Sequence, residues 1–175
     1  MDAAAHYLED AIVQAAKIKA LAEGAIAQLT DEELFQTIDP ESNSVALVMR
    51  HVAGNLRSRF TDFLTTDGEK PDRQRDGEFE MPSGTSRASV VAAWDAGFTC
   101  LDGALRQLTP ADLLREVTIR GGRHTVIQAL QRALTHVAYH VGQIVLLAKH
   151  LRGSNWKTLS IPRGQSEDFK GPRRF

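Results

Sequence analysis

The sequence predicts an all-α protein, a four-helix bundle with a long connection between its second and third helices. Two observations carry this prediction. Four long segments place apolar residues at spacings of three and four, which indicates helices that each bury one face. Between the second and third segments lies a charged stretch with several Gly and Pro residues, TTDGEKPDRQRDGEFEMPSGT, at positions 65–85. A connection of that length lets two consecutive helices of a bundle run parallel.

The first helix is expected from about Asp2 to Leu29. Its apolar residues follow the alternating spacing of a seam between bundle helices: Ala4, Leu8, Ala11, Ala15, Ile18, Ala22, Ala25 and Leu29. The small residues of this seam allow a neighbouring helix to approach closely. Thr30 and the three acidic residues after it predict a short additional helix before Pro40.

The second helix is expected from about Ser44 to Leu64. Its apolar stripe consists of Val45, Met49, Val52, Leu56, Phe60 and Phe63. His51 lies beside this stripe, at the margin of the core, where its ring can reach an ion held on a neighbouring helix. On its own, such a residue is more typical of a hydrogen-bonded core or boundary histidine. The connection at 65–85 is either a solvated crossover, the simpler interpretation, or a lid over a site at one end of the bundle.

The third helix is expected from about Ser86 to Leu108, with Trp94 in the core. A minor β-hairpin is expected after it. Two short β-prone runs, 117–119 and 124–126, flank Gly121 and Gly122, and this arrangement is typical of a tight turn.

The fourth long helix is expected from His124 to Arg152, where Gly153 ends it. Thr125 and Gln128 have the spacing of a capping box at its start. Its polar residues form only a narrow stripe: Gln128, Arg132, Thr135 and Tyr139. The C-terminal half, VGQIVLLA, is apolar almost all round, which indicates burial on more than one side. Together with the small-residue seam of the first helix, this excess apolar surface predicts a homodimer.

Residues 1–153 are therefore expected to form one bundle domain and residues 154–175 a tail. The tail shows no periodicity, and Trp156, Leu159 and Ile161 are the residues expected to dock it. Its last five residues, GPRRF, are expected to be loose.

Composition argues against several classes of protein. The 175 residues carry a formal net charge of −1, which gives no electrostatic footprint for nucleic acid. A single cysteine excludes an intramolecular disulfide framework and fits a reducing cytoplasm. No signal-peptide pattern opens the sequence, and no apolar run is long enough to span a membrane. The expectation is a cytoplasmic protein without nucleic-acid or membrane partners that acts on a small molecule.

Two histidines within the fourth helix carry the most chemistry. His136 and His140 are four positions apart, so their rings share one helical face, with about 5–6 Å between Cβ atoms. Burying two imidazoles without partners costs free energy, whereas an ion between them satisfies both. The same spacing occurs in zinc sites. From the pair alone, metal binding and two hydrogen-bonded core histidines are about equally supported.

The segments RHVAGN, around His51, and THVAYHVGQI, around His136 and His140, resemble the DinB/YfiT-like superfamily of four-helix proteins thought to depend on metals. The resemblance covers essentially the whole domain, including the long second connection. It implies a metal site with one histidine from the second helix and two from the fourth, here His51, His136 and His140. The charged connection and the tail around SIPRGQSEDF are similar to a subgroup classed only as a domain of unknown function.

Three imidazoles leave coordination positions open on an ion, which is typical of catalytic zinc sites. Zn²⁺, Ni²⁺ and Fe²⁺ all accept imidazole ligands. Members of the superfamily with known activity include transferases that use low-molecular-weight thiols. The resemblance thus implies an ion that activates a thiol or water for attack on a small electrophile. Two alternatives stay open: a non-catalytic metal- or small-molecule-binding protein of a stress response, and a structural dimer with vestigial histidines.

Two polar residues are candidates to orient the ligands. Gln143 follows His140 by three positions, and Asn55 follows His51 by four. A helix-interface hydrogen bond explains Gln143, and an exposed position explains Asn55, somewhat better. No Asp or Glu lies three or four positions from any of the three histidines, so the sequence identifies no general base and no catalytic residue.

Overall fold

A computed structural model describes residues 2–168 of the protein, and this part of the chain is largely helical. Its five α-helices are α1 (Ala3–Ile26), α2 (Asp31–Phe35), α3 (Val45–Phe60), α4 (Arg87–Gln107) and α5 (Val126–Arg152). Its two strands pair antiparallel and are β1 (Glu116–Ile119) and β2 (Gly122–Thr125). Its three short 3-10 helices are η1 (Asp76–Phe79), η2 (Pro110–Asp112) and η3 (Gly153–Asn155). The predominance of helix and the small hairpin expected from the sequence are thus confirmed.

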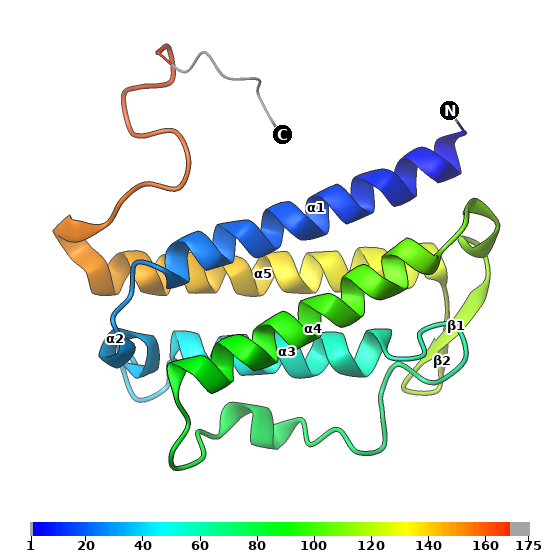
Figure 1. The fold of residues 1–175 in the computed structure, drawn as a ribbon, viewed down its shortest axis with the longest axis horizontal. Helices are drawn as coiled ribbons and strands as arrows, with labels where there is room; N and C mark the ends of the chain where they lie inside the picture. The colour runs from blue at the N-terminus through cyan, green and yellow to red at the C-terminus, as the bar shows by residue number, and fades with distance from the viewer. Residues whose placement is uncertain (1, 169–175) are drawn as a thin grey trace.

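The four long helices lie side by side along the longest axis of the molecule (Figure 1). Contacts join α1 to α5, α5 to α3, α3 to α4 and α4 to α1, so these helices enclose one core. Figure 1 shows that α1 and α5 run in one direction and α3 and α4 in the other. The connection at 61–86 makes this possible, because it runs back along α3 before α4 begins. Trp94, which was expected in the core, is only 1% exposed.

The end of α3 differs from the expectation. The helix stops at Phe60 instead of continuing to Leu64, because Thr61 is extended and Asp62 adopts a positive φ of 48°. A positive φ in a non-glycine residue breaks the helical hydrogen-bond series. This early exit directs the connection along the outside of α3, toward the position of η1.

The limits of α1 and α5 also shift by a few residues. α1 ends at Ile26, and the backbone N–H of Leu29 bonds to the Ile26 carbonyl in a turn. α5 begins at Val126, because His124 pairs with β1 in the hairpin and Thr125 caps the helix. The capping box of Thr125 predicted from the sequence is formed.

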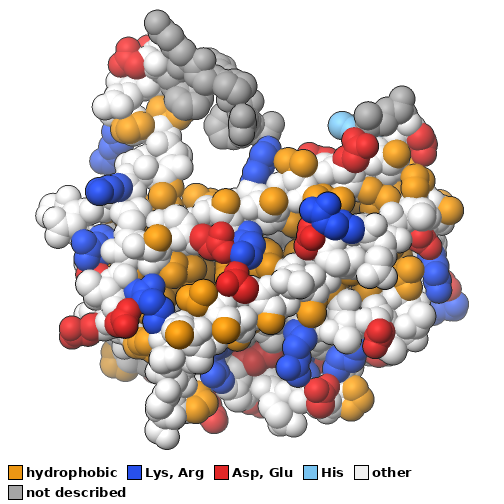
Figure 2. All heavy atoms as spheres, viewed as in Figure 1, with side chains coloured by type: hydrophobic (Ala, Val, Ile, Leu, Met, Phe, Trp, Pro, Cys, Tyr) orange, Lys and Arg blue, Asp and Glu red, His pale blue; other side chains and the backbone are white. Residues whose placement is uncertain are grey.

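Charges of both signs share the face drawn in Figure 2, where Lys and Arg side chains lie beside Asp and Glu. Lys19 of α1, for example, donates a hydrogen bond of 2.8 Å to Asp95 of α4. Paired and exposed charges of this kind contribute little to stability. Within residues 2–168, no helix combines the length and apolar character that a membrane crossing requires.

The first part of the tail lies against α1. Leu159 packs over Gly24, where an added β-carbon would lie 3.0 Å from its Cδ2 atom. The Gln28 side chain donates to the Lys157 carbonyl at 2.9 Å and accepts from the Lys157 N–H at 2.8 Å. The expectation that residues 171–175 are loose falls outside the described residues.

One glycine sets how closely α3 and α4 approach. A β-carbon added to Gly97 would lie 2.9 Å from Cα and 3.0 Å from the carbonyl oxygen of Ala53, both backbone atoms of α3. We expect Gly97→Ala to lower the free energy of unfolding by about 1–3 kcal/mol, because the helices must move apart. Gly103→Ala, on the same helix with no heavy atom within 4 Å, is the control. It should raise stability by up to about 1 kcal/mol. Urea unfolding measures both, and equal effects would contradict the close approach.

Candidate metal centre

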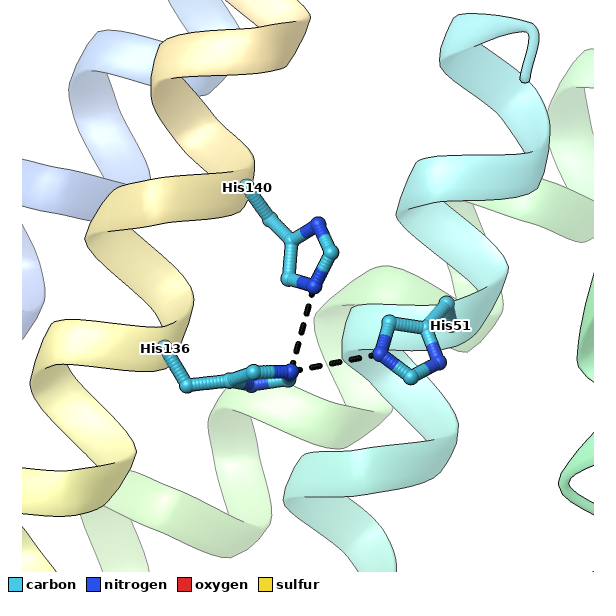
Figure 3. A group of neighbouring side chains, drawn as sticks. All are labelled: His51, His136 and His140. Carbon is cyan, nitrogen blue, oxygen red and sulfur yellow. Dashed lines mark hydrogen bonds between the residues drawn. The ribbon is translucent and has the colours of Figure 1, made fainter. Parts of the chain in front are cut away.

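Three histidines from two helices meet between α3 and α5 (Figure 3). His51 points from α3 toward His136 of α5, with 3.2 Å between their Nε2 atoms. His140, one turn further along α5, brings its Nε2 atom within 3.1 Å of the same His136 nitrogen. One ring nitrogen of each residue lies within 4.8 Å of the other two. Packing of α3 on α5 therefore adds the isolated histidine of α3 to the pair on α5.

Hydrogen bonds behind two of the rings determine where their hydrogens lie. His51 Nδ1 is 2.9 Å from a carboxylate oxygen of Glu78, and His140 Nδ1 is 2.7 Å from the amide oxygen of Gln143. Both oxygens accept hydrogen bonds, so each Nδ1 carries the hydrogen and each Nε2 carries a lone pair. Gln143 is itself oriented, because its Nε2 donates to the Tyr139 hydroxyl at 3.2 Å.

The ring of His136 cannot satisfy the other two histidines by hydrogen bonding, whereas a bound cation can satisfy all three. Nδ1 of His136 is buried and has no hydrogen-bond partner among the described residues. If His136 carries its hydrogen on Nε2, that one hydrogen must be shared between the lone pairs of His51 Nε2 and His140 Nε2. With its hydrogen on Nδ1, three lone pairs face one another. A divalent ion accepts all three lone pairs, so these residues fit a transition metal held by three imidazoles.

A carboxylate from the long connection supports the site. Glu78, in η1, is 9% exposed and accepts hydrogen bonds from both His51 and Arg73. Arg73 binds it in a bidentate manner, with Nε and Nη2 at 2.8 and 2.9 Å from the two carboxylate oxygens. Gly54 of α3 leaves the space, since a β-carbon there would lie 2.2 Å from Glu78 Oε1. Phe79 stacks on the His51 ring, with 4.7 Å between centroids.

These contacts also set the charge of Glu78. Burial raises its pKa, but the hydrogen bonds from His51 and Arg73 outweigh burial and hold the pKa below the usual range of a glutamate. Glu78 is therefore ionised at neutral pH and keeps the His51 Nδ1 hydrogen in place. Carboxylates that accept from a metal-bound histidine in this way orient the ring and raise its basicity.

The family described as "Protein of unknown function (DUF1572)" matches residues 2–165, nearly the whole chain. The chain belongs to the DUF1572 family. No curated protein and no solved structure matches it. The family description names no reaction, so the chemistry of this DUF1572 protein is argued from its own residues.

No motif or spacing in this DUF1572 sequence identifies Glu78 as part of the site. The absence of acids at helical spacing from the histidines holds, but the structure supplies a carboxylate from the connection, 27 positions after His51. The connection at 65–85 is thus more than a solvated crossover, because it delivers a buried side chain to the site. One residue of the sequence does indicate that another group approaches α3 closely. Gly54 lies inside a helix, where glycine costs roughly 1 kcal/mol relative to alanine, and this indicates the close approach of another group.

The two orienting candidates fall in different places. Gln143 holds the His140 ring, as described above. Asn55 is buried but forms no hydrogen bond to His51; it lines a cavity beside the histidines instead. Asn55 therefore does not orient the His51 ring, and its side chain is placed to meet a molecule in the cavity.

Burial gives the metal-free DUF1572 protein a defined pH dependence. Burial lowers the pKa of His136 to about 4, and the neighbouring His140 and His51 act in the same direction. Burial also lowers the pKa of His140, against the opposing effect of its hydrogen bond to Gln143. In the unfolded chain these pKa values return to about 6.5. Between pH 6.5 and 4, the unfolded state therefore binds more protons than the folded state, and stability falls as the pH falls.

We expect the metal-free protein to lose about 2 kcal/mol of unfolding free energy over this pH window, beyond the loss shown by a His136→Ala/His140→Ala variant. Urea unfolding in the presence of a chelator, repeated at several pH values, measures the difference. Parallel pH profiles for the two proteins would show that the histidines are not held neutral by burial.

Proposed function

We propose that the protein is a metal-dependent enzyme of the DinB/YfiT-like four-helix-bundle type. In this proposal His51, His136 and His140 bind one divalent ion. The observation that carries it is the convergence of three Nε2 atoms, two of them with lone pairs fixed by hydrogen bonds to Glu78 and Gln143. Because imidazole suits all three metals, Zn²⁺, Ni²⁺ and Fe²⁺ are the candidate ions.

The reaction that this site supports best is transfer of a low-molecular-weight thiol, or of water, to a small electrophile. When bound, a divalent ion with open coordination positions acts as a Lewis acid and lowers the pKa of a thiol or water that reaches it. The side chains of the protein supply orientation. Glu78 fixes the His51 ring, and Gln143 fixes the His140 ring. Phe79 covers one face of His51 and limits the approach of solvent from that side.

A turnover screen tests the activity. The metal-loaded protein is assayed for conjugation of thiols to small electrophiles and for ester and amide hydrolysis, beside the His136→Ala/His140→Ala variant. The proposal expects turnover that requires the metal and is lost in the variant. Equal rates with both proteins, or no turnover on any substrate with metal bound, would contradict catalysis.

A second function is favoured by one observation. Glu78 contacts only His51 among the three histidines, and its two oxygens are already engaged by His51 and Arg73, so it is a poor general base. A non-catalytic metal- or small-molecule-binding protein, as in a stress response, needs no base. Bound metal without turnover would support this function. The third alternative, a structural dimer with vestigial histidines, predicts no bound metal.

We also propose that the protein is cytoplasmic and forms a homodimer through α5. Leu146 of that helix is 69% exposed, and Val145 and Leu147 beside it are only partly buried, which leaves apolar surface on the C-terminal half of the helix. Light scattering at micromolar concentration tests the association, and a monomer would contradict it.

A further inference from the structure

A cavity of about 650 Å³ opens beside the three histidines. Its wall comes from α3, α5, the connection at 61–86 and the turn of the β1–β2 hairpin. His51 and His136 both line it, so a molecule in the cavity reaches two of the three rings. The volume lies within the range of about 300–1,000 Å³ that is typical of small-molecule sites.

The wall of this cavity is rich in positive charge. Five arginines line it: Arg59, Arg73, Arg75, Arg120 and Arg132. Among the described residues, no aspartate or glutamate lines it. The carboxylates that pair with some of these arginines lie outside the lining. Glu69 is 3.1 Å from both Arg59 and Arg120, and Glu78 binds Arg73. The surface that a ligand meets therefore presents guanidinium groups.

Two groups of the wall have no partner of their own. Arg132, one turn before His136 on α5, forms no ion pair within residues 2–168. It belongs to the polar stripe of α5, and two further members, Thr135 and Tyr139, also line the cavity. Asn55, one turn after His51 on α3, is 8% exposed, and its side chain forms no hydrogen bond with the described part of the chain. The Asn55 amide is not among the fully buried polar atoms that lack a partner, so it is open to the cavity that it lines, where a ligand can reach it.

A larger cavity, of about 830 Å³, lies on the other side of Glu78, between the connection and the α3–α4 pair. Its lining mixes positive residues such as Arg57 with acids such as Asp62 and Asp72. None of the three histidines lines it. The four basic residues of this lining are nearly balanced by three acidic ones, and the cavity gives no access to the histidines.

We propose that the 650 Å³ cavity binds the anionic group, a carboxylate or a phosphate, of the small molecule on which this protein acts. Arg132 binds the anion, Asn55 donates its amide hydrogens to it, and the remainder of the molecule extends toward His51 and His136. This inference rests on the proposed function for the role of the ligand as substrate. The binding itself depends only on the residues of the wall.

Calorimetric titration of the purified protein with inorganic phosphate and with succinate, at low ionic strength, tests the proposal. We expect at least one of the two anions to bind, and which of them binds distinguishes phosphate from carboxylate chemistry. Arg132→Gln should weaken that binding by about tenfold, because a charge-assisted hydrogen bond is lost. Asn55→Ala, which leaves the charge unchanged, should also weaken it. Arg132 is exposed, so its replacement is compatible with folding, which circular dichroism verifies.

Arg106→Gln is the matched control, since it removes the same charge from an exposed position on α4 outside the cavity. Binding of neither anion, or equal weakening by Arg106→Gln and Arg132→Gln, would overturn the proposal. Metal content, measured on the same samples, separates the two hypotheses. Metal without anion binding overturns only the anion site, and anion binding without metal overturns only the proposed metal function.

Discussion

Replacing His136 and His140 together by alanine is expected to abolish the stabilisation that a divalent metal gives the wild-type protein. A ligand that binds only the folded state, present at 100 times its dissociation constant, raises the free energy of unfolding by about 2.7 kcal/mol. The double variant retains one imidazole, His51, which is too few ligands for a site. Urea unfolding with and without Zn²⁺ or Ni²⁺ measures the gain, which should be present in the wild type and absent in the variant.

A second double variant controls for nonspecific binding of metal to histidine. His6 and His150 are exposed and lie outside the three-histidine cluster, so His6→Ala/His150→Ala removes the same number of imidazoles without touching it. This control should keep the full metal-induced gain. If it loses the gain instead, or if His136→Ala/His140→Ala keeps it, the metal binds elsewhere.

Replacing Glu78 by glutamine is expected to weaken metal binding by about 10- to 100-fold, although Glu78 is not itself a proposed ligand. The variant keeps the size of the side chain but loses the charge that holds the His51 Nδ1 hydrogen and binds Arg73. The His51 ring is then free to rotate or to change tautomer. Competition with a chromophoric chelator measures the affinity.

Gly54→Ala tests the same contact from the opposite side. An alanine β-carbon would occupy the space of Glu78 Oε1 and displace the carboxylate from His51, while alanine itself favours the helix by about 1 kcal/mol. Metal affinity should therefore fall without a large loss of stability. Gly142→Ala, in α5 with nothing near its added β-carbon, should keep the wild-type metal affinity and raise stability by up to about 1 kcal/mol. Wild-type affinity in both Glu78→Gln and Gly54→Ala would show that Glu78 does not position His51.

Local patterns in the sequence were sufficient to identify the helices, because apolar periodicity and capping residues act within a few positions. Thr125 with Gln128 marked the start of α5 to within one or two residues. The predicted end of α3, at Leu64, was wrong because the helix stops at Phe60 and Asp62 adopts a positive φ. Phe63 and Leu64 extend the apolar pattern beyond the point where the helix ends. Periodicity records which residues are apolar and does not record where the backbone turns.

The site likewise contains some residues that helical spacing brings together and others that only tertiary packing brings together. His136 and His140 share a face through helical spacing alone, so the sequence brings them together directly. The place of His51 beside them depends on the packing of α3 against α5. Glu78 lies in an irregular segment whose path follows no period, and only the tertiary structure brings it to His51. Helical spacing made Gln143 and Asn55 equally good candidates to orient a histidine. In the structure Gln143 contacts His140, whereas Asn55 lines the cavity.

Elemental analysis of the protein purified without a histidine tag tests the central claim most directly. The three-histidine site predicts about one transition-metal ion per chain, and it predicts that the His136→Ala/His140→Ala variant, prepared in the same way, contains none. A wild-type protein that contains no metal, and binds none after addition of Zn²⁺, Ni²⁺ or Fe²⁺, would contradict the metal centre and leave three imidazoles held by hydrogen bonds alone.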